Sequence, residues 1–283
     1  MKKILSMLML LTMTAFLSSC YASGSAPEPR GAMKNKTVQL KPFKAIEASG
    51  ALNVTIYQGS PKSYVELKGY ERGLKYSEVT VRNGKLSVAH KNNFGDVKDV
   101  VEVKIYCHDV TDLTSNGGAS VYTKSMVGLK VSLCATAGAK LRVDAVTCNS
   151  ANLTASAGGE MDVAGLKAST LAAEVSSGGS IDADKMAAAV STDLTASSGG
   201  SMKSHITTTH LKAIANSGGE LELQGEATNA NFSASSGGNI EAEELTVNDL
   251  KANASSAGNI SAKAVTADSH ADLTGSVNVT KVK

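Results

Sequence analysis

The sequence predicts an all-β protein, with a parallel β-helix of about 20 residues per coil over residues 114–283 after a β-rich segment over residues 37–113. Three observations predict this fold class. Pairs of turn residues recur at a nearly fixed spacing, apolar residues alternate with polar ones, and bulky side chains are scarce, with no Trp and 4% aromatic residues among 283. Charged residues make up only 19% of the chain, which is unlike a disordered protein. The scarcity of bulky core residues also argues against an α/β enzyme.

Residues 1–19 have the features of a secretory signal peptide. Lys2 and Lys3 precede an apolar run of 14 residues, and Leu17-Ser18-Ser19-Cys20 resembles the lipobox of bacterial lipoproteins. The run is too short to span a bilayer comfortably. We therefore expect Cys20 to be the lipid-modified, palmitate-bearing first residue of the mature chain, and residues 20–36 to form a flexible tether. The alternative is an ordinary secretory signal in which Cys20 is incidental.

The predicted anchor sets the expected location. Acyl chains on Cys20 would attach the protein to a membrane without a spanning helix, so we expect a cell-envelope protein at the outer membrane. Without Lys2 and Lys3 the mature chain carries 26 basic and 26 acidic residues. This balance gives no electrostatic reason to expect nucleic acid as a partner.

Residues 37–113 alternate apolar and polar side chains in short runs, as in Leu52-Asn53-Val54-Thr55-Ile56-Tyr57 and Lys85-Leu86-Ser87-Val88. Turn sequences separate the runs, and Asn83-Gly84 favours a two-residue hairpin turn. No apolar stripe of helical period is sustained here. The segment is therefore predicted to be β-structure.

From Ser115 onward the chain repeats. Turn pairs spaced by 19 to 21 residues are Gly118-Ala119, Gly138-Ala139, Gly158-Gly159, Gly178-Gly179, Gly199-Gly200, Gly218-Gly219, Gly237-Gly238 and Ala257-Gly258. A fixed period near 20 is typical of a solenoid, and the Gly pairs fit corners that need a positive φ or close backbone approach. Three short strands per coil predict a β-helix whose coils pair about 4.8 Å apart.

The phase of the apolar residues divides each coil into inward and outward positions. The first inward position after each turn holds Val121, Leu141, Met161, Ile181, Met202, Leu221, Ile240 and Ile260. A third apolar position holds Val146, Leu166, Met186, Leu245 and Val265. Before the turns, Leu153, Leu194 and Phe232 share one inward position, whereas Thr154, Thr195 and Ser233 beside them point outward. A narrow interior explains the abundance of Ala, because bulky side chains from three faces would overpack it.

The titratable and nucleophilic residues do not indicate catalysis. The five histidines are scattered, and His205 and His210 lack the spacing of metal ligands. Cys107-His108-Asp109 has no predicted partner base and is interpreted as a strand end. Cys134 is predicted on the outer face, as the likelier reactive thiol, and Cys148 in the core. We expect no metal and no cofactor, and the sequence leaves open whether Cys107, Cys134 and Cys148 form a disulfide.

Two ladders of outward residues are predicted. Small polar side chains beside the turns should hydrogen-bond between coils, and these are Thr136, Ser156, Ser176, Ser197, Asn216, Ser235 and Ser255. An acidic strip follows each turn and consists of Asp162, Asp182, Asp184, Glu222, Glu241, Glu243 and Glu244. This strip is either a solvated face or a site for a cation or a basic partner.

The aromatic residues bear on carbohydrate binding. A polysaccharide-degrading enzyme on this fold would need paired acids and aromatic platforms in a groove. From Ser115 onward the only aromatic residues are Tyr122 and Phe232, and Phe232 is predicted to be buried. We therefore expect no enzyme. Glycan contacts would have to come from the preceding segment, where the candidates are Tyr57, Tyr64, Tyr70 and Tyr76, together with Tyr106.

The mature chain from about Phe43 resembles the auto-transporter adhesin "head GIN" domain family of Bacteroidetes. The resemblance rests on Phe43-Lys44-Ala45-Ile46, Ser49-Gly50-Ala51-Leu52-Asn53-Val54, Asn83-Gly84-Lys85-Leu86 and the repeated Ser-Ser-Gly-Gly turns. It implies a β-helix-like envelope protein of adhesin type and brings no catalytic residues. The expected function is a non-enzymatic envelope lipoprotein that presents a repetitive surface to a host or envelope glycan or protein, as adhesin or scaffold. The alternative is a glycan-binding or polysaccharide-degrading β-helix protein.

Overall fold

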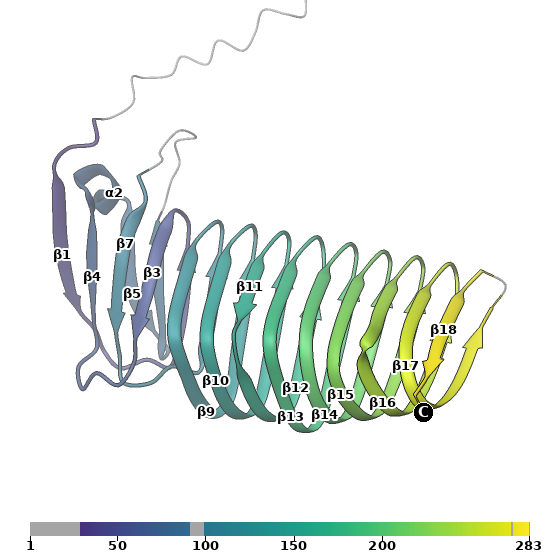
Figure 1. Cartoon of the computed structure of the whole chain (residues 1–283). Coiled ribbons are helices and arrows are strands. Elements are labelled where there is room, and N and C mark those ends of the chain that lie inside the picture. The colour runs from purple at the N-terminus through teal and green to yellow at the C-terminus, as the bar shows by residue number, and fades with distance from the viewer. Residues whose placement is uncertain (1–28, 91–98, 273, 283) are drawn as a thin grey trace, which may run out of the picture. The chain divides into compact units, whose positions relative to one another are not determined.

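The computed structural model describes residues 29–90, 99–272 and 274–282 and confirms the predicted fold class. Over these residues nearly all regular structure is β, and the one helix is the five-residue α2 (Glu71–Lys75). Residues 31–283 form one unit, in which a group of shorter strands lies at one end of a row of stacked β-coils (Figure 1). We call the described residues up to 113 the cap and those from 114 the solenoid.

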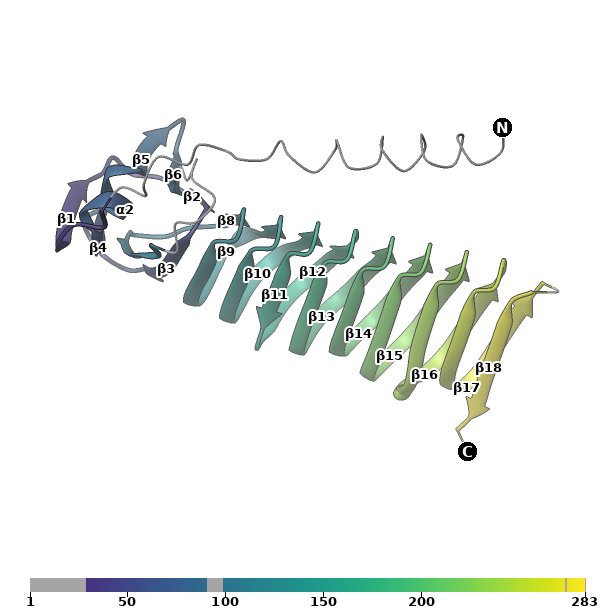
Figure 2. The ribbon, with the colours of Figure 1, turned by 90° about the horizontal axis from the view of Figure 1, so that it is seen from above.

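The cap strands form two runs that both end on the first coil of the solenoid. The strands are β1 (Met33–Gln39), β2 (Ala45–Ser49), β3 (Leu52–Tyr57), β4 (Tyr64–Tyr70), β5 (Ser77–Arg82), β6 (Lys85–His90), β7 (Val101–Tyr106) and β8 (Asp112–Asn116). One run has the order β1–β4–β7–β3 and the other β5–β6–β2–β8. Both β3 and β8 pair in parallel with β9 (Ser120–Thr136), so the cap continues two faces of the first coil (Figure 2).

The β5–β6 hairpin confirms the turn predicted at Asn83-Gly84. Both residues have positive φ angles, 51° and 73°. Two successive left-handed residues make the turn whose twist matches that of the flanking strands.

Strand β1 begins earlier than the sequence pattern predicts. It starts at Met33 and so includes residues 33–36, which were assigned to the tether. Its side chains are almost all exposed, so backbone pairing with β4, rather than an apolar pattern, defines this strand.

The solenoid strands run through the bends of each coil and pair in parallel with the next coil. They are β10 (Lys140–Ser156), β11 (Glu160–Val163), β12 (Leu166–Val175), β13 (Ser180–Ser197), β14 (Ser201–Asn216), β15 (Glu220–Ser235), β16 (Asn239–Ala254), β17 (Asn259–Ala271) and β18 (Ser276–Lys281). Their registers confirm the aligned positions, for example Leu141 opposite both Val121 and Met161. The predicted inward residues are buried, with the exception of Val265.

The inward side chains fit into the narrow interior because small side chains lie next to large ones from coil to coil. One inward column consists of Leu133, Leu153, Ala173, Leu194, Ala213, Phe232 and Ala252. Phe232 is fully buried between Ala213 and Ala252, and Leu194 lies between Ala173 and Ala213. An alanine above and below leaves the volume that a larger side chain needs, since interiors are close-packed.

The two residues of each turn pair have different roles. The first glycine has a left-handed φ, such as 71° at Gly199, after a left-handed Ser or Ala such as Ser198. The second glycine allows close approach of two coils, because a Cβ on Gly200 would lie 2.7 Å from the Val175 carbonyl carbon. Of the hydrogen bonds predicted between coils beside the turns, one is seen between the Thr136 and Ser156 hydroxyls, 3.1 Å apart.

Val265 corrects the predicted repeat. It is 47% exposed, whereas Ala264 is buried and pairs with Val247. The register jumps between β16 and β17, from Ala242 opposite Ala262 to Thr246 opposite Lys263. The coil that contains β17 is therefore shorter at this bend. The predicted turn pairs ended at Ala257-Gly258, so their spacing did not cover this coil.

Candidate functional site

The cap brings two of the four predicted contact tyrosines together and adds Tyr106 between them. The Tyr106 ring stacks on Tyr57 with centroids 5.0 Å apart and on Tyr64 with centroids 4.4 Å apart. The interplanar angles are 16° and 11°, so the three rings are nearly parallel. We call Tyr57, Tyr106 and Tyr64 the tyrosine stack.

Strand pairing produces the stack. Tyr106 in β7 lies opposite Tyr57 in β3 and opposite Tyr64 in β4. Inward neighbours such as Val65 and Ile105 are buried, so the tyrosines lie on the outer face of the same sheet. Both faces of Tyr106 are covered, and loss of hydration and the nearby Glu66 carboxylate raise its pKa. Tyr57 and Tyr64 each keep the ring face that is turned away from Tyr106.

Tyr70 and Tyr76 do not join the stack. Tyr70 precedes α2 and Tyr76 follows it, where the Lys75 ammonium lies 5.3 Å from the Tyr76 ring centroid. Tyr122 instead extends the aromatic surface, because it lies opposite Thr55 on the strand next to β3. Its hydroxyl donates to Asp144 at 2.6 Å, beside a shallow hollow of about 480 Å³ lined by Lys140, Arg142 and Asp162 among others.

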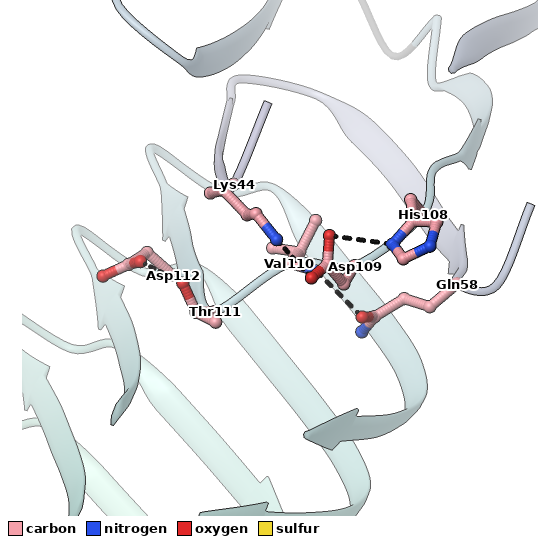
Figure 3. Close-up of polar contacts among 7 residues, drawn as sticks. All are labelled: Lys44, Gln58, His108, Asp109, Val110, Thr111 and Asp112. Carbon is pink, nitrogen blue, oxygen red and sulfur yellow. Dashed lines mark hydrogen bonds and ion pairs between the residues drawn. The ribbon is translucent and has the colours of Figure 1, made fainter. Parts of the chain in front are cut away.

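Polar contacts next to the stack hold the loop after β7 against the rest of the cap (Figure 3). The Gln58 side chain accepts from the Val110 amide at 3.0 Å and donates to the Ser125 carbonyl at 2.7 Å. The Asp109 carboxylate binds the Lys44 ammonium and lies 3.1 Å from His108 Nδ1. The hydrogen bond from Lys44 and that from His108 lower the pKa of Asp109. The loop after β7 is thus fixed beside the tyrosine stack.

The cysteines lack the environment of reactive thiols. Cys107 follows β7 as predicted and is buried, and burial together with Asp109 raises its pKa to about 12. Cys134, predicted to be the more reactive thiol, is half-buried, and burial raises its pKa. Cys148 packs against the core, as predicted. All three are free, and their raised pKa values disfavour the nucleophilic thiolate.

Four residues of the predicted acidic strip share one outward column, which basic residues interrupt, whereas Asp184, Glu243 and Glu244 lie outside this column. Arg142, Asp162, Asp182, Lys203, Glu222 and Glu241 are successive members of this column. The Lys203 ammonium lies 2.5 Å from Glu222. Partial burial, with Asp184 and Asp162 nearby, raises the pKa of Asp182. No group of three or more His, Cys, Asp or Glu side chains in the described parts of the chain is arranged to hold a metal ion.

A family model matches most of the chain. The model of the family described as "putative auto-transporter adhesin, head GIN domain" matches residues 42–205 and 187–282. The chain belongs to this family. No curated protein sequence matches it. The resemblance that the Ser-Ser-Gly-Gly turns and the Asn83-Gly84 hairpin indicated is therefore confirmed.

Solved structures of similar fold come from two Parabacteroides species. One, described as a putative adhesin from Parabacteroides merdae, is 18% identical, has a TM-score of 0.61, and the match covers 89% of this chain and 97% of that one. A putative adhesin from Parabacteroides distasonis is 18% identical with a TM-score of 0.63, covering 88% and 98%. A putative lipid binding protein from the same species is 15% identical with a TM-score of 0.57, covering 89% and 98%. At these identities the likeness concerns the fold.

The predicted signal peptide and Cys20 lie outside the described residues. Within the described part of the chain, no helix has the length and apolar character needed to cross a bilayer.

Proposed function

We propose that this head GIN domain protein is a lipid-anchored adhesin of the bacterial outer membrane that binds its partner through the tyrosine stack. The family and the solved structures of similar fold are adhesin-like, which supports a binding role. The choice of surface rests on the exposed rings that gather where the cap meets the first coil: Tyr57 in the cap is 44% exposed, and Tyr122 on the first coil is 36% exposed. Tyrosine is enriched in binding surfaces because its ring is apolar and its hydroxyl is polar.

The anchor rests on the sequence alone. The lipobox-like Leu17-Ser18-Ser19-Cys20 supports acylation, and 12 residues separate Cys20 from the start of β1. Cys20→Ser should abolish incorporation of labelled palmitate in the producing bacterium and release the protein from the membrane fraction. Unchanged labelling and membrane association of this variant would contradict the anchor.

A glycan is the first candidate partner, since sugars pack against aromatic rings and hydrogen-bond to hydroxyls. Tyr57 and Tyr64 each have one ring face that is not covered by Tyr106. The stack presents three hydroxyl groups in a row, an arrangement suited to an extended saccharide on a flat sheet. The protein would act without catalysis, as a receptor for the sugar.

Binding to immobilised glycans and matrix proteins tests the surface. Tyr57→Ala and Tyr64→Ala should each weaken binding about tenfold, because each removes a ring from the contact. Tyr76→Ala is the matched control, because this ring lies outside the stack, and it should bind as the wild type does. Equal binding by all three variants would place the partner elsewhere. Release of reducing sugar from a bound polysaccharide would overturn the non-enzymatic assignment.

A further inference from the structure

Beyond the end of the tyrosine stack, Lys41 and Lys62 lie just outside the paired ends of β1 and β4. These strands pair antiparallel up to Gln39 opposite Tyr64, and the next backbone hydrogen bond runs from Leu40 N to Ser63 O at 2.9 Å. Lys41 follows Leu40 and Lys62 precedes Ser63, so the two lysines are the next residues beyond this hydrogen bond, near Tyr64. Both lysines are exposed.

Neither of these two lysines is neutralised by a carboxylate. Lys34, Lys44, Lys68 and Lys85 in the cap each form an ion pair with a carboxylate. Within the described residues, Lys41 and Lys62 have no such partner, and neither do Lys36 and Lys104. Two ammonium groups on neighbouring segments repel each other. A bound anion would remove this repulsion.

The acidic residues near the tyrosine stack do not neutralise Lys41 and Lys62. Asp109 is engaged by Lys44 and His108, so its charge is compensated within the cap. Glu66 lies opposite Lys104 and interacts with the Tyr106 hydroxyl, on the side of the stack away from Lys41 and Lys62. Along β4 the outer face therefore carries Glu66 and then Tyr64, and Lys62 follows beyond the strand end, while Tyr106 and Tyr57 lie beside Tyr64 on the neighbouring strands.

We infer that the ligand of the tyrosine stack is an acidic saccharide, with its carboxylate or sulfate bound between Lys41 and Lys62. This inference rests on the proposed glycan-binding function and specifies the chemical class of the sugar. The sugar ring packs beside Tyr64, where one face is free of Tyr106, and its hydroxyls meet the phenols and Glu66. An ammonium pair binds a carboxylate or sulfate through charge-assisted hydrogen bonds, which are stronger than those between neutral groups.

Paired probes that differ only in charge test this inference. The mature protein with Cys20→Ser is assayed against uronic-acid, sialylated and sulfated glycans, each beside its carboxyl-reduced or desulfated form. We expect at least about tenfold tighter binding to the charged member of a pair, weakening as salt rises. Equal binding to the neutral forms would overturn the inference and leave the proposed glycan binding intact.

Variants of the lysine pair locate the effect. Lys41→Gln with Lys62→Gln should remove the preference for the charged probe, whereas Lys41→Arg with Lys62→Arg should keep it. Lys251→Gln on the solenoid is a control with the same loss of charge. The Gln double variant should also melt at the same or a higher temperature, because it removes the repulsion between the two ammonium groups. A preference for charge that survives in it would place the anion elsewhere and refute the assignment.

Lipid vesicles test whether the bound anionic group belongs to a membrane surface rather than to a saccharide. Phosphatidylglycerol vesicles and neutral phosphatidylcholine vesicles are compared with the same protein in a flotation assay. We expect that Lys41 and Lys62 do not bind the protein to either kind of vesicle. Flotation with the anionic vesicles, lost in the Gln double variant and with no charged glycan bound, would show a lipid-surface site and overturn the saccharide assignment.

Discussion

The cap and the solenoid are both β-structures, yet they are stabilised differently. In the solenoid every coil repeats the same contacts with the next, and small side chains fill a narrow interior. In the cap, strands distant in sequence pair with each other, and a buried ion pair joins Arg72 to Asp99 with N–O distances of 2.7 and 2.9 Å. Repetition produces a uniform surface, whereas the irregular cap gathers unlike side chains such as the tyrosine stack at one place. The cap is therefore the part of the molecule suited to selective binding.

The largest expected effect tests the interior of the solenoid. Leu194→Asp buries an unpaired charge at a position that is 1% exposed, and it should lower the free energy of unfolding by about 4 kcal/mol or more. Thr195→Asp, one residue later on the outer face, should be nearly neutral. Urea unfolding midpoints measure both. Similar losses in the two variants would mean that a second layer covers the outer face.

The next effect tests the cap. Asp99→Ala leaves the Arg72 guanidinium buried without this carboxylate and should cost about 3–5 kcal/mol. Amide exchange should rise mainly in the cap, since a solenoid is stabilised by contacts between adjacent coils. Lys203→Ala, which breaks the exposed pair with Glu222, is the control and should cost less than about 1 kcal/mol. Uniform loss of protection through all coils would show that cap and solenoid unfold together.

Two adjacent glycines test how the coils approach one another. Gly199→Ala strains only the backbone, at about 1–2 kcal/mol, since Ala257 has a φ of 61° at the equivalent place. Gly200→Ala should cost more, because its Cβ would be within 2.8 Å of three backbone atoms of the previous coil. Thermal melting ranks the two. A smaller loss for Gly200→Ala would indicate that the coils can separate at little cost.

A stabilising substitution tests the interior from the opposite direction. The Thr192 hydroxyl is buried without a hydrogen-bond partner in a column with Leu171 and Leu211. Thr192→Val keeps the shape and removes the unsatisfied group, so the free energy of unfolding should rise by about 1 kcal/mol. Thr195→Val on the outer face should leave it unchanged. Destabilisation by Thr192→Val would reveal a partner for the hydroxyl, such as a water molecule.

The smallest effect concerns the last turn. The Asp272 carboxylate accepts hydrogen bonds from the Ser256, Thr274 and Gly275 amides, which lower its pKa to about 2. Because the folded pKa is depressed, the stabilisation is present above pH ~4, the range of the unfolded carboxyl, and is lost as the pH falls through about 2.

Amide exchange followed by NMR at pH 5 and at pH 2.5 measures this effect. The Ser256 and Gly275 amides should lose protection at the lower pH, relative to the intrinsic exchange rate. Asp272→Ala should show the reduced protection at both values. A wild-type protein equally protected at both values would mean that the carboxylate does not hold the turn.

The sequence alone determined the architecture of the solenoid. The spacing of the Gly pairs and the period-two phase placed residues such as Leu153, Leu194 and Phe232 inside, because in a solenoid each residue contacts its equivalent in the next coil. It also identified the family, and it proposed Tyr57 and Tyr64 as contact residues. These conclusions depend on local patterns, which a sequence contains directly.

Only the tertiary structure decided what depends on pairing between distant strands. The order β1–β4–β7–β3 places Tyr106 between Tyr57 and Tyr64 and brings Lys41 and Lys62 to the neighbouring ends of β1 and β4, while Tyr70 and Tyr76 remain outside. Most cap strands show the same alternation, so the pattern fixes which face a residue occupies but not which strand lies beside it. The shortened coil at Val265 was missed because it follows the last predicted turn pair, Ala257-Gly258, so the period was only extrapolated across it. The repeat thus encodes the scaffold locally, whereas the candidate binding site arises from non-local strand order.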